Sequence, residues 1–276
     1  MTYWNAVLLG LVQGVAEFLP ISSSGHLAVL QNFLAIGDME NHMLFDVLLH
    51  LGTLAAVILA FWKDVREVVT EFARMLHIRR TPRGLRPNRR ERRLISFLII
   101  ATLPLIPAAF LSKVVESLYQ NTFFIGFAFI LTGFLLFAAD RMGHGNKDER
   151  SSTTADALVV GLAQAVAVVP GLSRSGTTIS FGMLRGFERS FAVKFSFLLS
   201  IPAVLGANLV SIIKVFSTGV EWSYVPMYLV GVACAFVSGY FAIYFLRLVV
   251  QRGKFGGFCY YCWGAGLVTL LLSLIS

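Results

Sequence analysis

The sequence has few charged residues. Asp, Glu, Lys and Arg together make up 14% of its 276 residues, against roughly 25% in an average soluble domain. Apolar residues make up 57%, and the mean hydropathy is +0.74. This number of charged residues is too small to cover a water-exposed surface. The composition therefore excludes an ordinary soluble enzyme and any disordered or collagen-like chain. The sequence therefore predicts a membrane protein with several spans.

Basic residues are missing from the first 62 positions, and 11 of the 23 Lys and Arg residues fall between Lys63 and Arg93. The net charge of +8 is therefore mostly a property of one segment. A nucleic-acid-binding surface is not indicated, and no nucleic-acid partner is expected. The positive-inside rule places this basic segment in the cytoplasm. Without a basic region before the first apolar run, no cleavable signal peptide is expected.

Cysteine is also scarce, with three residues in the chain. Cys259 and Cys262 have C-x-x-C spacing, but they stand in an aromatic run without a nearby His or a further Cys. Structural zinc and redox sites need such additional ligands or a soluble context. We therefore interpret these thiols as small packing residues of a membrane helix.

Long apolar runs are abundant. A bilayer core of about 30 Å requires roughly 20 apolar residues in a helix, and six segments qualify: 44–62, 94–112, 119–139, 191–213, 225–248 and 257–275. Segments 3–36 and 156–186 are also apolar, but each is interrupted by a polar, Gly-rich break. Irregular backbone at membrane depth persists only where protein buries it or where it lines a wet cavity. The predicted fold is an all-α polytopic membrane protein with about six full transmembrane helices plus two re-entrant helical hairpins.

The two interrupted segments resemble each other. With a constant offset of 151 residues, positions 10–26 and 161–177 are identical at eight of 17 sites, including paired Gln, Ser and Gly residues. Residues 1–150 are therefore predicted as one repeat, with hairpin 3–36, spans 44–62, 94–112 and 119–139, and a basic cytoplasmic loop 63–93. Residues 151–276 form the second, with hairpin 156–186 and spans 191–213, 225–248 and 257–275. Because three spans follow each hairpin, the halves have inverted topology, and such repeats build their site where broken helices meet.

The first interrupted segment contains the carboxylate Glu17. Gln13 stands four residues before it, on the same helix face. A charge in such an apolar run is expensive and is functional by default. Glu17 is a candidate ligand of a divalent cation or a candidate general base, with Gln13 as a neutral second oxygen donor. The alternative is a carboxylate that lines a cavity without a chemical role.

The break that follows Glu17 consists of Ser22, Ser23, Ser24 and Gly25, and ends at His26. Small residues before a helix expose backbone N–H groups, which can bind an anion. The alternative is a run of serines that only caps a helix. His26 favours chemistry, because an imidazole beside hydroxyl groups can serve as a base or a nucleophile.

The second break contains Arg174, the only cation between Ala157 and Leu184. Its guanidinium group can bind two phosphate oxygens at once. Neighbouring hydroxyl and N–H groups would complete a phosphate cradle made of Ser173, Ser175, Gly176, Thr177 and Thr178. The alternative, compatible with the first, is a buried ion pair between Arg174 and Glu17. Weaker candidates for cavity lining or helix–helix hydrogen bonding are Asp46, His50 and Asn208.

These motifs resemble the undecaprenyl-diphosphate phosphatase family, also called bacitracin-resistance proteins. The resemblance rests on Gln13-Gly-Val-Ala-Glu17, on the segment from Ser22 to His26, and on the full match of Pro170 to Thr178 to Pro-Gly-x-Ser-Arg-Ser-x-x-Thr. It covers essentially the whole chain. Family positions with functional roles fall on Glu17, Ser23, His26, Ser173 and Arg174. Gln13 departs from the pattern, because many members have Glu there.

The resemblance implies an enzyme that removes the terminal phosphate of undecaprenyl diphosphate. It thereby recycles the lipid carrier for cell-wall synthesis and confers bacitracin resistance, and bacitracin is connected to it only through the shared substrate. It also implies a requirement for a divalent cation, Mg or Ca. Of the two candidate ligands, Glu17 and Gln13, Glu17 must supply the anionic oxygen, because Gln13 has no charge where many members have Glu. The expected location is the bacterial inner membrane, with the active site facing the periplasmic side; a homodimer is left open.

The hypothesis for the mechanism places the diphosphate on Arg174 and on the two helix N-termini. Ser23 attacks with His26 as its base, while direct attack by His26 or by an activated water stays open. A transporter or flippase of a phosphorylated lipid is the main alternative, since inverted repeats are typical of transporters. The type-2 phosphatidic-acid phosphatases fit less well, because no Lys-x6-Arg-Pro precedes Ser24 and no His follows Arg174.

Overall fold

The computed structural model describes residues 2–33, 39–77, 88–218 and 222–274. These residues form α-helices and two short 3₁₀ turns, and they contain no β-strand. The predicted all-α class is confirmed. The helices, in chain order, are α1 (Tyr3–Phe18), α2 (Ser23–Phe33), α3 (Met39–Ala60), α4 (Trp62–Met75), α5 (Arg89–Thr102), α6 (Leu105–Ala109), α7 (Ser112–Tyr119), α8 (Thr122–Met142), α9 (Thr154–Val166), α10 (Arg174–Leu184), α11 (Arg189–Thr218), α12 (Val225–Gln251) and α13 (Phe258–Ser273).

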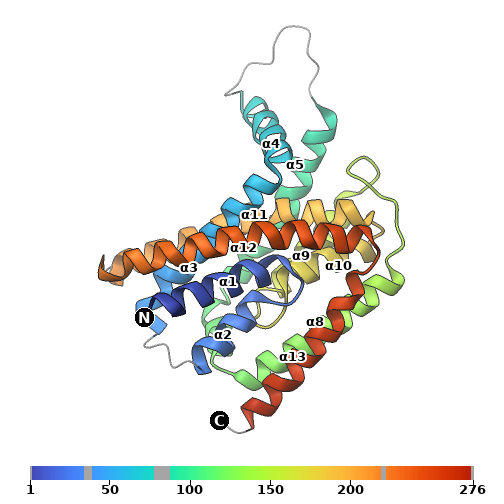
Figure 1. Ribbon diagram of the computed structural model, residues 1–276. Helices are drawn as coiled ribbons and strands as arrows, with labels where there is room; N and C mark the ends of the chain where they lie inside the picture. Colours follow the sequence, from blue (N-terminus) through green and yellow to red (C-terminus); the bar gives the residue numbers. More distant parts are fainter. Residues whose placement is uncertain (1, 34–38, 78–87, 219–221, 275–276) are drawn as a thin grey trace.

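Five helical stretches of the described chain are long and apolar enough to cross a membrane, and there are six if α3 and α4 count as one bent span. Figure 1 shows α1, α3, α11 and α12 running side by side, with α8 and α13 paired along another side of the bundle. Large apolar side chains point outward from these helices, such as Phe127 on α8 and Phe241 on α12, which are 56% and 65% exposed. A multi-pass membrane protein presents such side chains to lipid.

Each interrupted segment forms two short helices. The first break spans residues 19–22, between α1 and α2, and the second spans residues 167–173, between α9 and α10. Helices α1 and α9 begin at Tyr3 and Thr154, and α2 and α10 begin at Ser23 and Arg174. Both pairs of starting residues are separated by 151 positions, which is the offset of the sequence repeat. The repeated sequences therefore fold into the same helix–break–helix unit.

The two units contact equivalent helices in the opposite half of the chain. Helix α1 packs along α12, and α9 packs along α5. Glycine permits the close approach in both cases. A Cβ atom on Gly10 would collide with the carbonyl oxygen of Gly231, and one on Gly161 would collide with that of Ala101. Since Gly10 and Gly161 are also 151 residues apart, the repeat extends from the helices to their packing.

The prediction that residues 63–93 form a loop is wrong, because most of the segment that the structure describes is helical. Helix α3 ends at Ala60, the chain turns by 91°, and α4 runs from Trp62 to Met75. Apolar Val65, Val68 and Phe72 recur at helical spacing and alternate with charged residues, which is the pattern of an amphipathic helix. Helix α5 already begins at Arg89, so only residues 76–88 connect the two, of which 78–87 lie outside the described residues.

The second and third predicted spans are present as Arg89–Ala109 and Thr122–Met142, with bounds that differ from the prediction. The segment 94–112 is interrupted at Leu103 and Pro104, because proline cannot supply the N–H that continues a helix. The expected connection 113–118 is helical and belongs to α7. Helix α8 begins three residues later than predicted, at Thr122, where Asn121 caps it by accepting a hydrogen bond from the N–H of Phe124.

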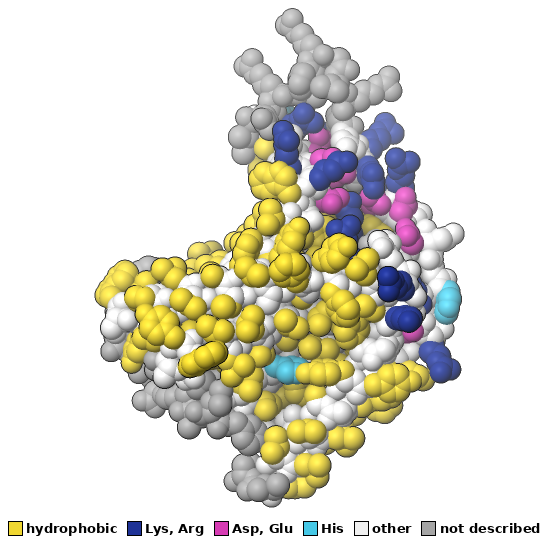
Figure 2. Space-filling view, in the orientation of Figure 1, with side chains coloured by type: hydrophobic (Ala, Val, Ile, Leu, Met, Phe, Trp, Pro, Cys, Tyr) yellow, Lys and Arg dark blue, Asp and Glu magenta, His cyan; other side chains and the backbone are white. Residues whose placement is uncertain are grey.

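Charged side chains gather at one end of the molecule. Figure 2 shows Lys and Arg around the projecting α4–α5 pair and along the adjoining edge, while the body of the bundle is covered by apolar side chains. Several of these charges form ion pairs: Arg92 with Glu71, Lys194 with Asp64, and Arg189 with Asp140. The clustering of charge that the sequence indicates is thus present in the structure, and the assignment of this end to the cytoplasm stays a prediction.

Candidate active site between the two breaks

The two breaks have the same hydrogen-bond pattern. In the first, Ser22 Oγ lies 3.3 Å from Ser24 Oγ and accepts a hydrogen bond from the N–H of Gly25. In the second, Ser173 Oγ lies 3.3 Å from Ser175 Oγ and accepts from the N–H of Gly176. The first serine of each motif is therefore a helix cap. The alternative interpretation, in which the serines only cap a helix, is therefore correct for Ser22 and Ser173.

The two breaks also pack closely against each other. A Cβ atom on Gly25 would lie 3.0 Å from the Cα atom of Gly171, and one on Gly176 would lie 3.1 Å from Cβ of Pro20. Ser175 Oγ donates to the carbonyl oxygen of Leu19 at 3.3 Å. Each glycine thus faces the opposite break, and the starts of α2 and α10 are brought together.

Glu17 stands at the centre of this junction and is 7% exposed. One carboxylate oxygen pairs with Arg174, at the start of α10. The other accepts hydrogen bonds from Ser23 Oγ at 2.6 Å and from Gln13 Nε2 at 3.1 Å. His50 Nε2, from α3, lies 4.0 Å from the same oxygen. The buried ion pair that the sequence left as an alternative is present, and the predicted residues Gln13, Glu17, Ser23 and Arg174 converge.

His26 is held apart from Ser23. Its Nδ1 lies 2.7 Å from the carbonyl oxygen of Ser22, and its Nε2 lies 2.8 Å from the hydroxyl of Tyr261. Both imidazole nitrogens are occupied by groups other than Ser23, and the Ser23 hydroxyl donates its hydrogen bond to Glu17, so the structure does not pair His26 with Ser23 as the expected base. The reason is geometric, because both residues lie on α2 and a backbone carbonyl of the preceding turn captures the imidazole.

The remaining predicted phosphate-binding residues divide into two groups. Thr178 Oγ1 bonds to Ser196 of α11 at 2.6 Å, so its hydroxyl serves helix packing. Thr177 is 4% exposed, and its Oγ1 has no hydrogen-bond partner. A buried hydroxyl without a partner beside Arg174 is an available donor for a ligand oxygen.

Sequence reasoning missed Tyr261, because nothing in the spacing of an aromatic run on a lipid-exposed helix points to a histidine 235 positions away. His50 was identified only as a weaker candidate. Its neighbour Asp46 accepts a hydrogen bond from Gln31 at 3.3 Å, which joins α3 to α2. The weaker candidate Asn208 is buried on α11, with its Nδ2 atom unpaired.

The Cys259–Cys262 pair is buried, with both thiols reduced. Cys262 Sγ donates to the carbonyl oxygen of Pro20 at 3.5 Å, so α13 supports the first break. The described residues contain no group of three or more His, Cys, Asp or Glu side chains that could bind a metal by themselves. The buried Oε1 atom of Gln13 has no hydrogen-bond partner, while Nε2 of the same amide donates to Glu17. A carboxylate oxygen and an amide oxygen are the kinds of donor that a hard cation prefers, with its other ligands coming from a substrate.

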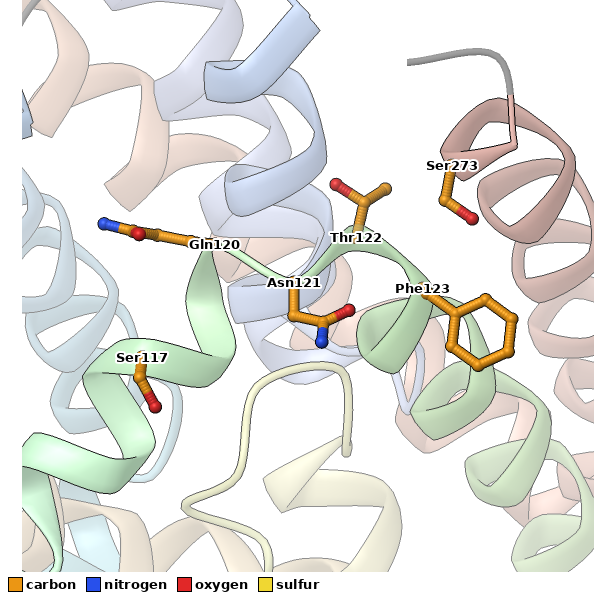
Figure 3. Close-up of a pocket in the computed structure, with 6 residues that line it drawn as sticks. All are labelled: Ser117, Gln120, Asn121, Thr122, Phe123 and Ser273. Atoms are coloured by element: carbon orange, nitrogen blue, oxygen red, sulfur yellow. The ribbon is translucent and has the colours of Figure 1, made fainter.

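A hollow of about 390 Å³ lies elsewhere, where α7 meets α8 beside the end of α13. Figure 3 shows its six lining residues, which are Ser117, Gln120, Asn121, Thr122, Phe123 and Ser273. None of them belongs to the predicted site. The chemistry-bearing residues instead lie at the contact of the two breaks, where a ligand must displace existing hydrogen bonds.

The fold and the site together define a class: a multi-pass membrane protein in which two broken helices join a carboxylate, an arginine and a serine. Comparison with known proteins makes this assignment more specific. Residues 6–268 match the family model described as Bacitracin resistance protein BacA, and the chain belongs to this family.

Curated relatives match over the full length. The undecaprenyl-diphosphatase of Alkaliphilus metalliredigens is 41% identical over 277 residues, which cover 100% of both chains. That of Halothermothrix orenii is 36% identical, with 99% of each chain covered. That of Syntrophotalea carbinolica is 41% identical, with 96% of this chain and 97% of the relative covered.

Proposed function

We propose that this protein is an integral membrane phosphatase that hydrolyses undecaprenyl diphosphate to undecaprenyl phosphate and inorganic phosphate. In this role it recycles the lipid carrier of cell-wall synthesis and confers bacitracin resistance. The observation that carries the proposal is the meeting of Arg174, Glu17 and Ser23 at the contact of the two breaks. The family and the names of the relatives agree with this chemistry.

Arg174 binds the diphosphate. Its guanidinium pairs with Glu17 in the structure, and a substrate carrying more negative charge competes for it. The N–H groups at the starts of α2 and α10 and the unpaired Thr177 hydroxyl offer further donors. The apolar surface of the bundle accommodates the polyprenyl chain beside the headgroup.

Ser23 is the nucleophile and Glu17 accepts its proton. The Oγ–H group already donates to the carboxylate at 2.6 Å, which is within reach for a general base. The Ser23 oxygen forms a bond to the terminal phosphorus, and the bond from phosphorus to the bridging oxygen breaks. Undecaprenyl phosphate leaves with that oxygen, and the phosphoryl group remains on Ser23. Arg174 stabilises the charge that develops on the phosphoryl oxygens.

His26 serves the second step. It stands three residues after Ser23 on α2, so both side chains lie on one helix face. Water attacks the phosphoserine, His26 Nε2 takes its proton, and the Ser23 oxygen leaves and regains a proton from Glu17. Inorganic phosphate is released. This assignment replaces the expected pairing of His26 with Ser23.

A divalent cation, Mg or Ca, would be held by the Glu17 carboxylate and by Gln13 Oε1, with substrate oxygens as the remaining ligands. Such an ion would neutralise charge on the diphosphate. Because Gln13 is neutral, Glu17 is the charged ligand of this pair.

The proposed orientation places the charged end, with α4 and the start of α5, in the cytoplasm of a bacterial inner membrane. The two halves are then an inverted repeat whose site opens to the periplasmic side. Support comes from the reciprocal packing of α1 on α12 and of α9 on α5.

The test is phosphate release from undecaprenyl diphosphate by the purified protein in detergent, without an ion gradient. We expect turnover that stops with a chelator, returns with Mg²⁺ or Ca²⁺, and is nearly abolished in Arg174→Ala. Binding of the lipid without phosphate release would support the transporter alternative and overturn the proposal. Turnover that persists in Arg174→Ala would remove Arg174 from the mechanism.

The nucleophile is tested separately by rapid quenching with a substrate labelled in the terminal phosphate. We expect label on Ser23, and its accumulation in His26→Ala. Label on His26, or no phosphoenzyme in either protein, contradicts the role assigned to Ser23.

A further inference from the structure

Tyr261 and His26 come from opposite ends of the chain and meet beside the site. The Tyr261 hydroxyl lies 2.8 Å from His26 Nε2, and the two rings stack with their centroids 5.7 Å apart and their planes at 15°. Phe129 closes the imidazole from another side, edge-on at 5.0 Å. The imidazole is thus held by two aromatic rings and by hydrogen bonds at both nitrogens.

The partner of Nδ1 determines the tautomer of His26. A backbone carbonyl can only accept a hydrogen bond, so the contact of Nδ1 with the Ser22 carbonyl oxygen requires the proton on Nδ1. In the neutral imidazole, Nε2 then carries the lone pair. Ser22 has a φ angle of +71°, and its carbonyl oxygen accepts from both the N–H and the Nδ1–H of His26. The first break therefore selects Nε2 as the reactive nitrogen.

A hydroxyl group suits Nε2 in both protonation states. The Tyr261 hydroxyl donates to Nε2 of the neutral ring and accepts from Nε2–H of the imidazolium. The contact can therefore persist through a cycle in which His26 gains and loses a proton.

We infer that Tyr261 is a positioning residue for His26: its ring and its hydroxyl fix the orientation of the imidazole and keep Nε2 directed toward the site. The inference rests on the proposed function only for the identity of the reaction. The geometry of Tyr261 and His26 does not depend on it.

The test compares Tyr261→Phe with Tyr260→Phe in the full-length protein. The phenyl ring that Tyr261→Phe introduces preserves the stack and lacks the hydroxyl. Tyr260 is the matched control, because it is the adjacent residue on α13, is 69% exposed and packs against Trp263 rather than His26. Elution as a single species and an unchanged melting temperature establish that each variant is folded.

The first readout is the rate at which diethyl pyrocarbonate modifies His26, followed by mass spectrometry of the peptide that contains it. This reagent attacks an unprotonated, accessible imidazole nitrogen and needs no turnover. We expect the rate to rise about fivefold in Tyr261→Phe, the factor that corresponds to one net hydrogen bond of about 1 kcal/mol. Tyr260→Phe is expected to react as the wild type does.

The second readout is the steady-state kinetics of phosphate release. We expect kcat to fall about fivefold to tenfold in Tyr261→Phe with KM within about twofold, because the change affects proton transfer and not the phosphate contacts. An unchanged modification rate, an unchanged kcat, or equal effects in Tyr260→Phe would each overturn the role of Tyr261. If the wild type releases no phosphate, the proposed function fails, and the modification rates still decide whether Tyr261 holds His26.

Discussion

The two breaks share one scaffold and differ in chemistry. Ser22, Ser24 and Gly25 in the first have the same hydrogen bonds as Ser173, Ser175 and Gly176 in the second. At the other positions of the repeat the first has Glu17, Ser23 and His26, and the second has Val168, Arg174 and Thr177. The first unit therefore supplies the acid, the hydroxyl and the imidazole, and the second supplies the cation. Equivalent hydrogen bonds thus hold an asymmetric site, and the backbone differs as well, because Ser22 has a φ angle of +71° and Ser173 one of −72°.

Among the differences between the two breaks, substitution of Arg174 is expected to have the largest effect on kcat/KM. Arg174→Lys keeps the positive charge but loses the planar fork that binds two oxygens. We expect kcat/KM for undecaprenyl diphosphate to fall about 10³-fold, within the range seen for arginines that stabilise a transferring phosphoryl group. Arg252→Lys is the control, because Arg252 is exposed at the end of α12. A loss below about tenfold would contradict the phosphate-binding role.

Glu17→Gln removes the one carboxylate of the junction and keeps its size. We expect kcat to fall about 10²-fold because Ser23 loses its proton acceptor, and we expect the concentration of Mg²⁺ or Ca²⁺ needed for turnover to rise because the cation loses its charged ligand. The kinetic constants for phosphate release check both parts.

The double variant Glu17→Gln/Val168→Glu moves the carboxylate to the equivalent position of the second break. We expect that it does not restore phosphate release. The exposed Glu67 provides the matched control Glu67→Gln, which should be fully active. Restored turnover in the double variant would show that the breaks are interchangeable and would contradict the assigned asymmetry.

The two equivalent glycines are expected to differ in stability. A Cβ atom on Gly25 would lie 2.6 Å from the ring of Phe129, whereas one on Gly176 would meet nothing nearer than 3.0 Å. Gly25→Ala should therefore lower the free energy of unfolding by about 1–3 kcal/mol, and Gly176→Ala by less. Thermal unfolding in detergent measures both, with Gly206→Ala on α11 as the control, where a Cβ would meet no atom within 4 Å. The reverse order would contradict the packing of the breaks.

The smallest expected effect is at the starts of α1 and α9. Thr2 and Thr153 cap them in the same way, but the third residue of each helix is Asn5 in the first and Asp156 in the second. Burial raises the pKa of Asp156, but hydrogen bonds from Lys147, Thr153 and Arg185 outweigh it and lower the pKa from 3.8 to about 2.

Because the pKa is lowered in the folded state, this stabilisation is present above about pH 4 and disappears as the pH falls toward about 2. Asp156→Asn should lower the melting temperature at pH 7 and remove this part of the acid sensitivity, and the loss should be about 1–2 kcal/mol. Thermal melts between pH 7 and pH 3 measure both effects. Equal acid sensitivity in the variant and in the wild type would contradict the assignment.

Much of the site was predictable because charges within apolar sequence are rare and expensive. Glu17 and Arg174 stood out for this reason, and the constant offset of the repeat placed both in equivalent breaks. The amphipathic helix α4 was not predicted, because its many charges were interpreted only as a topology signal. The role of Glu17 as the partner of Ser23 was also missed, since sequence distance favoured His26, which is three residues away.

The sequence by itself determined that the chain is a membrane protein, that two helices are broken, and which side chains are available at the breaks. These properties follow from local composition, from the energetic cost of burying charge, and from a repeat visible along the chain. Tertiary structure decided which side chains meet. Arg174 reaches Glu17 across 157 positions and Tyr261 reaches His26 across 235. Such contacts depend on how α1, α2, α10 and α13 pack, and helix packing is set by the shapes of all the contacting faces together.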